Sequence, residues 1–401
     1  MLIHKGFKYR LYPTEEQEEI LLQCGGNTRF LWNYALMLNQ DYYKETSKFK
    51  FYYEMAMSLP ELKKEHPFLK ISHSQSLQTV LKQFDKALKN SFKNKKGFPK
   101  FKKKLLLNDS FTSPQAWKLK KGFVFIPKVG EVKWKKNRPL KGKPKSITIK
   151  QDGNKWYCSV LCEYEVKEKK KKSKNIVGCD VGIKEFATLS DETVINNPKI
   201  TNKYKDKLTK EQRSLSKKKN GGKNRFKQRL KVRKVQNKIK DTRIDFLHKT
   251  SSSIAKNYDG IVVEDLNVVG MLKNHCLAKA ISDVSWSEFN RQLEYKCLWN
   301  FKHYIKIDRF FPSSKTCSRC GCVQDMPLSK RTFNCPDCGL KMDRDYNSSI
   351  NIKEQGLNLI KNTQSNTLGY SEINACGDVL LGTSMKQEKE CLDNQAEATR
   401  L

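Results

Sequence analysis

The stretch CSRCGCVQDMPLSKRTFNCPDC, residues 317–338, places Cys317, Cys320, Cys335 and Cys338 in two C-x-x-C pairs. Two thiolates at this spacing form a metal-binding knuckle, and two knuckles supply the tetrahedral four-sulfur site that Zn²⁺ favours. Because sulfur would fill all four positions, the ion would stabilise the fold and have no open position for catalysis. The spacing predicts a structural zinc ribbon, with Cys322 as a bystander thiol.

Acidic segments lie on both sides of this ribbon. Residues 262–265 (VVED) precede it, residues 343–347 (DRDYN) follow it, and a third segment, residues 176–182 (IVGCDVG), lies further upstream. Mg²⁺ prefers oxygen ligands, and two such ions about 4 Å apart can activate water and stabilise the leaving oxygen of a phosphodiester. Three carboxylates from separate segments would suffice, so the pattern predicts a nuclease-type metal site that the ribbon interrupts.

The residues alone leave the role of each acid open. Asp180 ends an apolar strand and could equally be a turn or helix cap. Glu264 and Asp265 are neighbours on a strand and point to opposite faces, so they cannot both face one site. Asp343 and Asp345 share a face if the chain is extended, and Asp345 could also cap the helical segment that follows while binding metal.

The charge of the chain favours a polyanionic partner. Lysine and arginine total 79 against 42 acidic residues, a formal net charge of +37, and the lysines are interleaved with apolar residues along nearly the whole length. Affinity for nucleic acid should therefore fall steeply as salt rises. No apolar run approaches the roughly 20 residues needed to cross a bilayer, the start does not read as a signal peptide, and 13 cysteines, most without framework spacing, favour reduced thiols in the cytoplasm.

The first part of the chain reads as a β unit interrupted by helices. Residues 7–12 alternate as a strand, and Thr14 and Gln17 stand at capping-box spacing. Helical spacing continues to about Phe92, with expected breaks near Gly25-Gly26 and Pro60.

Strand patterns begin at Phe111 and end in a hairpin around the turn residues Asp152-Gly153-Asn154. Residues 167–174 are nearly all lysine and are interpreted as a solvated linker at the main domain boundary. In the second part, a helical pattern lies between the strands that end near Asp180 and Glu264. Its Val235 and Ile239 share one face with Thr242 and Phe246, while cations populate the others. We interpret that cationic surface as one that follows nucleic-acid phosphates.

Together these segments resemble the TnpB family of bacterial insertion-sequence proteins, which are often labelled transposases and are related to type V CRISPR effectors. The resemblance covers nearly the full chain and includes the hairpin region. Its motifs are residues 9–13, 97–102, 178–182, 263–266, 312–317 and 343–347. The chain departs from the family at Ser348-Ser349, where alanines are usual, and at Cys179, where an aliphatic residue is usual.

The resemblance implies a RuvC-like nuclease site in which Asp180, Glu264 and Asp345 are the catalytic acids and hold two Mg²⁺ ions. It leaves Asp265 and Asp343 as neighbours. It also implies a guide RNA from the end of the element, double-stranded target DNA beside a short adjacent motif, and cutting of both strands. We further expect a monomer that does not enter membranes.

The implied fold class is a multidomain α+β protein with a β-barrel-like wedge domain, a helical recognition insertion and an RNase H-like (RuvC) domain that carries the ribbon. The expected parts are 1–13 and 111–166 (wedge), 14–110 (helical insertion), 167–174 (linker), 175–311 and 342–362 (RuvC-like), 312–341 (zinc ribbon), and 363–401 (tail with little order).

Two other functions compete with a guided nuclease. A guide-dependent repressor would occupy DNA without cutting it, and an eroded acidic set would mark it. A DNA-strand transferase acting in transposition could use the same acids but would also have to join strands. All three acids are present, which favours the endonuclease.

Overall fold

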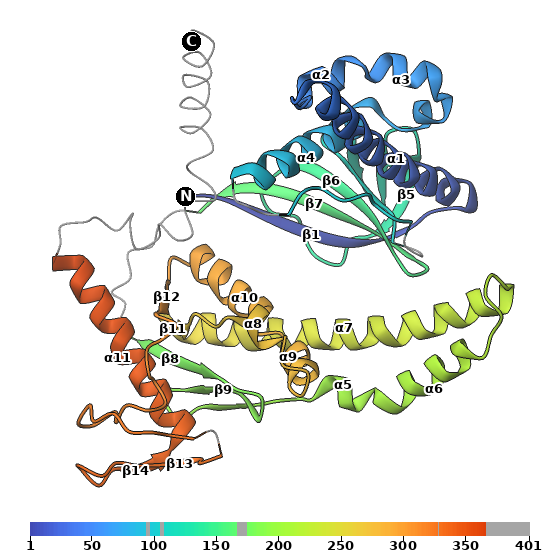
Figure 1. Cartoon of the computed structure of the whole chain (residues 1–401). Coiled ribbons are helices and arrows are strands. Elements are labelled where there is room, and N and C mark those ends of the chain that lie inside the picture. Colours follow the sequence, from blue (N-terminus) through green and yellow to red (C-terminus); the bar gives the residue numbers. More distant parts are fainter. Residues whose placement is uncertain (94–96, 105–107, 167–174, 328, 366–401) are drawn as a thin grey trace. The chain divides into compact units, whose positions relative to one another are not determined.

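The computed structural model describes residues 1–93, 97–104, 108–166, 175–327 and 329–365. The chain divides into two compact units, Met1–Glu168 and Lys169–Leu401 (Figure 1). The expected lysine linker, residues 167–174, and the part of the tail beyond residue 365 lie outside the described residues.

An antiparallel seven-stranded sheet with the order β2-β6-β7-β1-β5-β4-β3 forms the first unit. In β1, Phe7, Tyr9 and Leu11 are buried while the residues between them are more exposed, as the sequence alternation predicts. The strands are β1 (Leu2–Tyr12), β2 (Ser110–Ser113), β3 (Lys118–Lys120), β4 (Phe123–Ile126), β5 (Gly130–Lys135), β6 (Lys143–Asp152) and β7 (Lys155–Glu165). The predicted hairpin is confirmed, because Asp152 pairs with Lys155 across a two-residue turn.

Helices follow β1 and pack a core of their own. They are α1 (Glu15–Thr46), α2 (Tyr52–Met57), α3 (Leu59–Glu65), the 3₁₀ helix η1 (Pro67–Ile71) and α4 (Ser74–Lys93). The capping box is confirmed, since Thr14 and Gln17 exchange bonds of 3.2 and 3.3 Å. The break at Pro60 is confirmed as well, at the start of α3.

The predicted break at Gly25-Gly26 is wrong, because α1 continues through it. A Cβ atom on Gly25 would lie 2.6 Å from the Cβ of Asp109, so this glycine permits a close contact with the chain just before β2. Residues 97–104 have no regular structure and run along α1, where Trp32 and Asn33 donate to the carbonyls of Lys100 and Lys102 at 3.0 Å.

A five-stranded sheet with the order β10-β9-β8-β11-β12 organises the second unit. Strands β8, β11 and β12 are parallel, whereas β9 and β10 join antiparallel. The strands are β8 (Ile176–Val181), β9 (Glu185–Leu189), β10 (Val194–Asn196), β11 (Gly260–Glu264) and β12 (His303–Ile307). The helices are α5 (Ile200–Lys203), α6 (Lys205–Ser216), α7 (Lys223–Asn257), α8 (Val268–Met271), α9 (Ala278–Val284), α10 (Trp286–Trp299) and α11 (Arg344–Ser365).

Alternation along the parallel strands gives this sheet two different faces. Val177 and Cys179 of β8 pack with α7 and α10 in one apolar cluster, whereas Val262 of β11 packs with Ile352 of α11 on the opposite side. Because residues two apart on a strand share a face, Gly178 and Asp180 lie on the α11 side.

Two glycines allow α11 to approach the sheet closely. A Cβ atom on Gly178 would lie 2.1 Å from the carbonyl oxygen of Ser349, and one on Gly356 would lie 2.5 Å from the Val262 side chain. This contact sets the start of α11 near the carboxyl ends of β8 and β11. The small sheet of β13 (Thr332–Asn334) and β14 (Lys341–Asp343) belongs to the ribbon and leads directly into α11. Among the described helices, none is long and apolar enough to span a membrane.

Candidate active site and zinc ribbon

Asp180 and Glu264 lie side by side at the ends of two parallel strands. Val263 of β11 pairs with Cys179 of β8, so the next step of the same register brings Glu264 beside Asp180. Both side chains are on the α11 face, because each is two residues beyond a residue that contacts α11. The strand pattern therefore brings together two of the three predicted acids.

Asp345, the third acid, is the second residue of α11. The expectation that Asp345 could cap this helix is wrong, because Asp343 performs that role. The Asp343 carboxylate accepts from the backbone N–H groups of Asp345 (2.9 Å) and Tyr346 (3.1 Å). The Asp345 carboxylate is therefore not used as the helix cap. It lies in the first turn of α11, where the helix dipole favours negative charge.

The charges of Glu264 and Asp345 both act on Asp180. Burial of its carboxyl, followed by the negative charges of Glu264 and Asp345, raises the pKa of Asp180 well above its usual value, although part of the residue remains accessible. Hydrogen bonding to Ser348 and the charge of Arg344 act in the opposite direction. Burial also raises the pKa of Glu264, and a hydrogen bond from Ser313 opposes that shift. Around Asp180 the negative charges outweigh the one nearby arginine, so a bound cation would be favoured there.

Asp265 is turned away from this site and is bound by a neighbouring cation. The guanidinium of Arg309 pairs with its carboxylate and also donates to its backbone carbonyl at 2.9 Å. The choice between Glu264 and Asp265 that the sequence left open is thus resolved in geometry, with Glu264 on the α11 face.

Arginines already contact Asp345. The guanidinium of Arg344 donates to one carboxylate oxygen at 2.9 and 3.1 Å, and Arg331 from the ribbon lies 3.4 Å from the other. Arg344 is itself buried and donates to the carbonyl of Lys330. These contacts fix the orientation of Asp345.

Two buried serines complete the site. Ser313, just before the ribbon cysteines, donates its hydroxyl proton to Oε1 of Glu264. Ser348 of α11 donates to the Ser313 hydroxyl at 3.1 Å and lies within hydrogen-bonding reach of Asp180. Ser313 lies within the family motif 312–317 but was not predicted to contact the acids, and Ser348 was noted only as a departure from the family pattern. That departure was the available signal.

The four predicted zinc ligands converge. The Sγ atoms of Cys317, Cys320, Cys335 and Cys338 all lie within 4.8 Å of one another, and within the described chain this is the one His, Cys, Asp or Glu group with that spacing. Two backbone N–H groups, of Cys338 and Asp337, contribute to lowering the pKa of Cys335 to about 6, which favours the thiolate that binds metal. The donor set fits a tetrahedral zinc ion. The three carboxylates are spaced more widely, so they do not form an equally closed cage.

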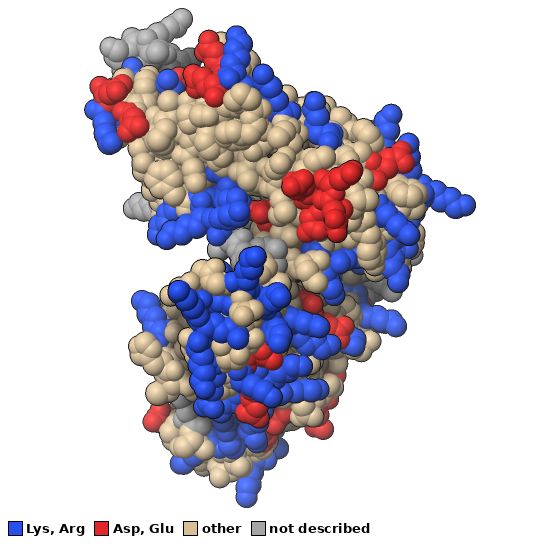
Figure 2. All heavy atoms as spheres, turned by 90° about the vertical axis from the view of Figure 1, so that its right-hand side faces the viewer, with Lys and Arg blue, Asp and Glu red and all other residues tan. Residues whose placement is uncertain are grey.

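Cations gather on α7 and its neighbours. Figure 2 shows lysines and arginines over the part of the second unit where the α6–α7 pair ends. Five exposed lysines of α7 fall within a sector of about 80° around the helix and span about 22 Å of its length. This lysine stripe consists of Lys223, Lys227, Lys231, Lys234 and Lys238. The predicted packing face is confirmed for Val235 and Ile239, which are buried, while Thr242 and Phe246 are half-buried.

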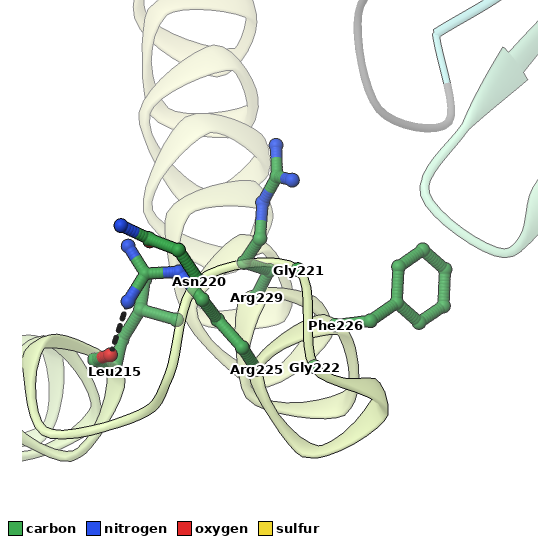
Figure 3. Close-up of a pocket in the computed structure, with 7 residues that line it drawn as sticks. All are labelled: Leu215, Asn220, Gly221, Gly222, Arg225, Phe226 and Arg229. Atoms are coloured by element: carbon green, nitrogen blue, oxygen red, sulfur yellow. Dashed lines mark hydrogen bonds between the residues drawn. The ribbon is translucent and has the colours of Figure 1, made fainter.

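An open hollow lies between the end of α6 and the start of α7, and it contains none of the three acids (Figure 3). Arg225 closes one side by donating to the carbonyls of Leu215 (2.9 Å) and Lys218 (2.8 Å), so it caps the end of α6. Phe226 points away from that contact. The hollow therefore belongs to the helix connection.

Family models match three parts of the chain. A model described as "Probable transposase" (OrfB_IS605) matches residues 159–275, one described as "Cas12f1-like, TNB domain" matches residues 286–352, and a "Helix-turn-helix domain" model matches residues 1–48. Within the last range the structure has a strand followed by one uninterrupted helix.

Curated relatives match almost end to end. A Streptomyces pristinaespiralis protein named "Putative RNA-guided DNA endonuclease" is 37% identical over 88% of this chain and 90% of its own length. The Escherichia coli K12 protein "Putative RNA-guided DNA endonuclease InsQ" is 33% identical over 96% of this chain and 97% of its own length. Overlap with a chain in the cryo-EM structure of a Cas12f1–sgRNA–target DNA complex is weak, with a TM-score of 0.35 at 17% identity over 88% of this chain and 99% of that one.

Proposed function

Because the chain belongs to the TnpB family of insertion-sequence proteins, we propose that it is an RNA-guided DNA endonuclease of a transposable element, with Asp180, Glu264 and Asp345 as its catalytic acids. The observation that carries this proposal is the convergence of these three acids from β8, β11 and α11. The sheet has three adjacent parallel strands, β8, β11 and β12, and continues from β8 through antiparallel pairing to β9 and β10, which supports an RNase H-like (RuvC) fold for the second unit.

The residues of the site fit divalent metal ions. The raised pKa of Asp180 arises partly from two neighbouring negative charges, and a bound cation would relieve that repulsion. When bound, a pair of Mg²⁺ ions supplies an activated water and stabilisation of the leaving phosphate oxygen. The protein's part is to hold Glu264 through Ser313 and Asp345 through Arg344, so that their carboxylates stay in place when substrate enters.

The partners follow from charge and family together. A guide RNA would pair with the target DNA strand and read its sequence, while the protein reads backbone shape and a short adjacent motif. The lysine stripe of α7 is suited to phosphate contacts, because its five cations are exposed and lie on one side of a straight helix. The four cysteines would hold a structural zinc ion.

The repressor and the strand transferase are less well supported. A repressor has no need for three acids close together, and contacts from Ser313 to Glu264 and from Arg344 to Asp345 support the nuclease instead. A transferase would release joined DNA products from element ends, whereas hydrolysis leaves free ends.

The first experiment is to purify the Asp180→Ala protein from cells that carry its native locus and to sequence the RNA that comes with it. We expect one dominant RNA with a fixed boundary at the edge of the element. That RNA then programs cleavage assays, in which wild-type protein cuts matched DNA and Asp180→Ala does not. A heterogeneous RNA mixture would refute guided activity, and cutting by Asp180→Ala would refute the site.

A further inference from the structure

We propose that the base of the zinc ribbon positions the nuclease centre, with Ser313 as the residue that holds Glu264 and Ser348 as its support. The inference rests on the proposed function, because it concerns the carboxylates assigned there. Ser313 and Ser348 are positioning residues: they contact the carboxylates and not the reacting atoms. If so, the affinity of the site for a divalent cation depends on the Ser313 hydroxyl, which is 49 positions from Glu264 in the chain.

The contacts form a continuous chain across the site. Ser313 donates to Oε1 of Glu264, Ser348 donates its one hydroxyl proton to Ser313 at 3.1 Å, and the Ser348 oxygen lies within hydrogen-bonding reach of Asp180. Within the described residues no hydrogen bond is made to Oε2 of Glu264, which leaves that oxygen available to a cation. A carboxylate held by one oxygen and free at the other is the usual arrangement for a well-oriented metal ligand.

Buried amides hold Ser313 in place from α11. Asn351 donates its side-chain amide to the carbonyls of Ser313 (2.8 Å) and Thr316 (2.6 Å). One turn earlier, Asn347 donates to the same Thr316 carbonyl at 2.7 Å and accepts from the N–H of Ser318 at 3.0 Å. The ribbon's entry segment is therefore fixed to the helix that carries Asp345.

Burial distinguishes this arrangement from a chance surface contact. Asn347 and Ser348 are 0% and 1% exposed, and Ser313 and Asn351 are 5% and 6% exposed. Leaving one of these polar groups without a partner would cost on the order of 1–3 kcal/mol, so the network resists rearrangement. That resistance restricts the orientation of Glu264.

Ser349 provides a matched control beside Ser348. It is also fully buried, but its hydroxyl donates to the carbonyl of Tyr346 at 2.7 Å within the same helix and contacts neither acid. Alanine at position 348 or 349 removes one hydroxyl from α11 in each case. The two variants differ in whether that hydroxyl supports Ser313.

The test measures Mg²⁺ binding by calorimetry to the full-length, RNA-free protein with its zinc retained. The heat that disappears in Asp180→Asn defines binding at the nuclease centre. Because mutation of a residue that orients a metal ligand typically costs roughly 10–100-fold in metal affinity, we expect Ser313→Ala to weaken Mg²⁺ by that factor. Ser313→Thr keeps a hydroxyl and should restore affinity, Ser348→Ala should weaken it to a smaller extent, and Ser349→Ala should not change it.

Cleavage kinetics give a second readout. Ser313→Ala should need more Mg²⁺ for half-maximal rate, yet reach a near wild-type rate when Mg²⁺ saturates. Unchanged Mg²⁺ affinity in Ser313→Ala overturns the proposal, and so does an equal loss in Ser349→Ala, because general damage to the core would then explain both. If Ser313→Ala does not fold, Ser348→Ala decides alone, and wild-type Mg²⁺ affinity in that variant refutes the proposed role of the Ser348–Ser313 contact. If Asp180→Asn leaves Mg²⁺ binding intact, the nuclease centre itself is wrong and the inference falls with it.

Discussion

Replacing Asp180 with asparagine should stabilise the metal-free protein. Asp180 shares its site with Glu264 and Asp345, and its pKa is raised by burial and by their charges. A carboxyl whose pKa is higher in the folded state binds more protons when folded, so its effect on stability becomes unfavourable as pH rises through the window from the unfolded pKa to the raised folded pKa. At neutral pH without metal the charge therefore opposes folding, and asparagine removes it.

The magnitude follows from the charges around the site. Two carboxylates about 4–8 Å apart repel by roughly 2–4 kcal/mol at an effective dielectric constant of 20. Ser348 and Arg344 offset part of this repulsion, which leaves a net gain of about 1–2 kcal/mol for Asp180→Asn. For a unit of this size, about 1 kcal/mol shifts the melting temperature by about 2–4 °C.

With Mg²⁺ bound, the wild-type protein should have a higher melting temperature than Asp180→Asn, the reverse of the order without metal. At a hundred times its Kd a ligand stabilises the folded state by about 2.7 kcal/mol, which should raise the wild-type melting temperature by about 5–10 °C and leave Asp180→Asn nearly unchanged. Lower pH should weaken the Mg²⁺ effect, because protons compete for the raised-pKa carboxyl. The assay is thermal unfolding with and without Mg²⁺ at several pH values, with zinc kept constant. A lower melting temperature for metal-free Asp180→Asn, or an equal Mg²⁺ shift in both proteins, would refute this reasoning.

Three further outcomes are expected. Changing the five lysines of the stripe to glutamine should reduce the slope of log affinity against log salt for duplex nucleic acid by about 4, measured by fluorescence anisotropy. The control is the same change at five exposed lysines elsewhere in the unit. An equal reduction of the slope in the control would count against the stripe. Gly178→Ala should cost about 1–3 kcal/mol in urea unfolding because its Cβ would meet Ser349, whereas Gly6→Ala, with open space around it, should cost far less. Cys335→Ser should lose the bound zinc in elemental analysis and melt earlier, while Cys322→Ser should keep one zinc per chain, and retention by both would remove the cysteine site. The control lysines are Lys249, Lys256, Lys273, Lys279 and Lys341.

Local features of the fold were predictable from the sequence. The strand with Asp180, the strand with Glu264, the Thr14 capping box and the Asp152–Lys155 hairpin each depend on residues within a few positions of one another. The continuity of α1 through Gly25 was not predictable from the sequence. A glycine is needed there because Asp109, far along the chain, packs against that position. Propensity indicates that glycine weakens a helix, but it does not reveal a distant side chain that requires the missing Cβ.

The same distinction applies to the site. Spacing and alternation indicated the acids, but the choice of cap between Asp343 and Asp345 depended on how β14 enters α11, which a strand pattern does not specify. Ser313 could not be recognised because its partner Glu264 is 49 residues away and its hydroxyl has no local role.

A single helix explains why the ribbon interrupts the nuclease sequence at this point. Asp345, Ser348 and Asn351 recur at intervals of three along α11, so they lie near one side of it. Asp345 is one of the three acids, Ser348 donates to Ser313, and Asn351 donates to the carbonyls of the segment that enters the ribbon. The two glycine contacts press the same helix onto β8 and β11, which carry the other acids. An insertion between β12 and α11 therefore begins and ends beside the carboxylates, and any change that moves the ribbon base also moves the groups that hold Glu264. We therefore expect the ribbon to contribute to catalysis through position, although a zinc ion held by four thiolates would have no coordination site for substrate.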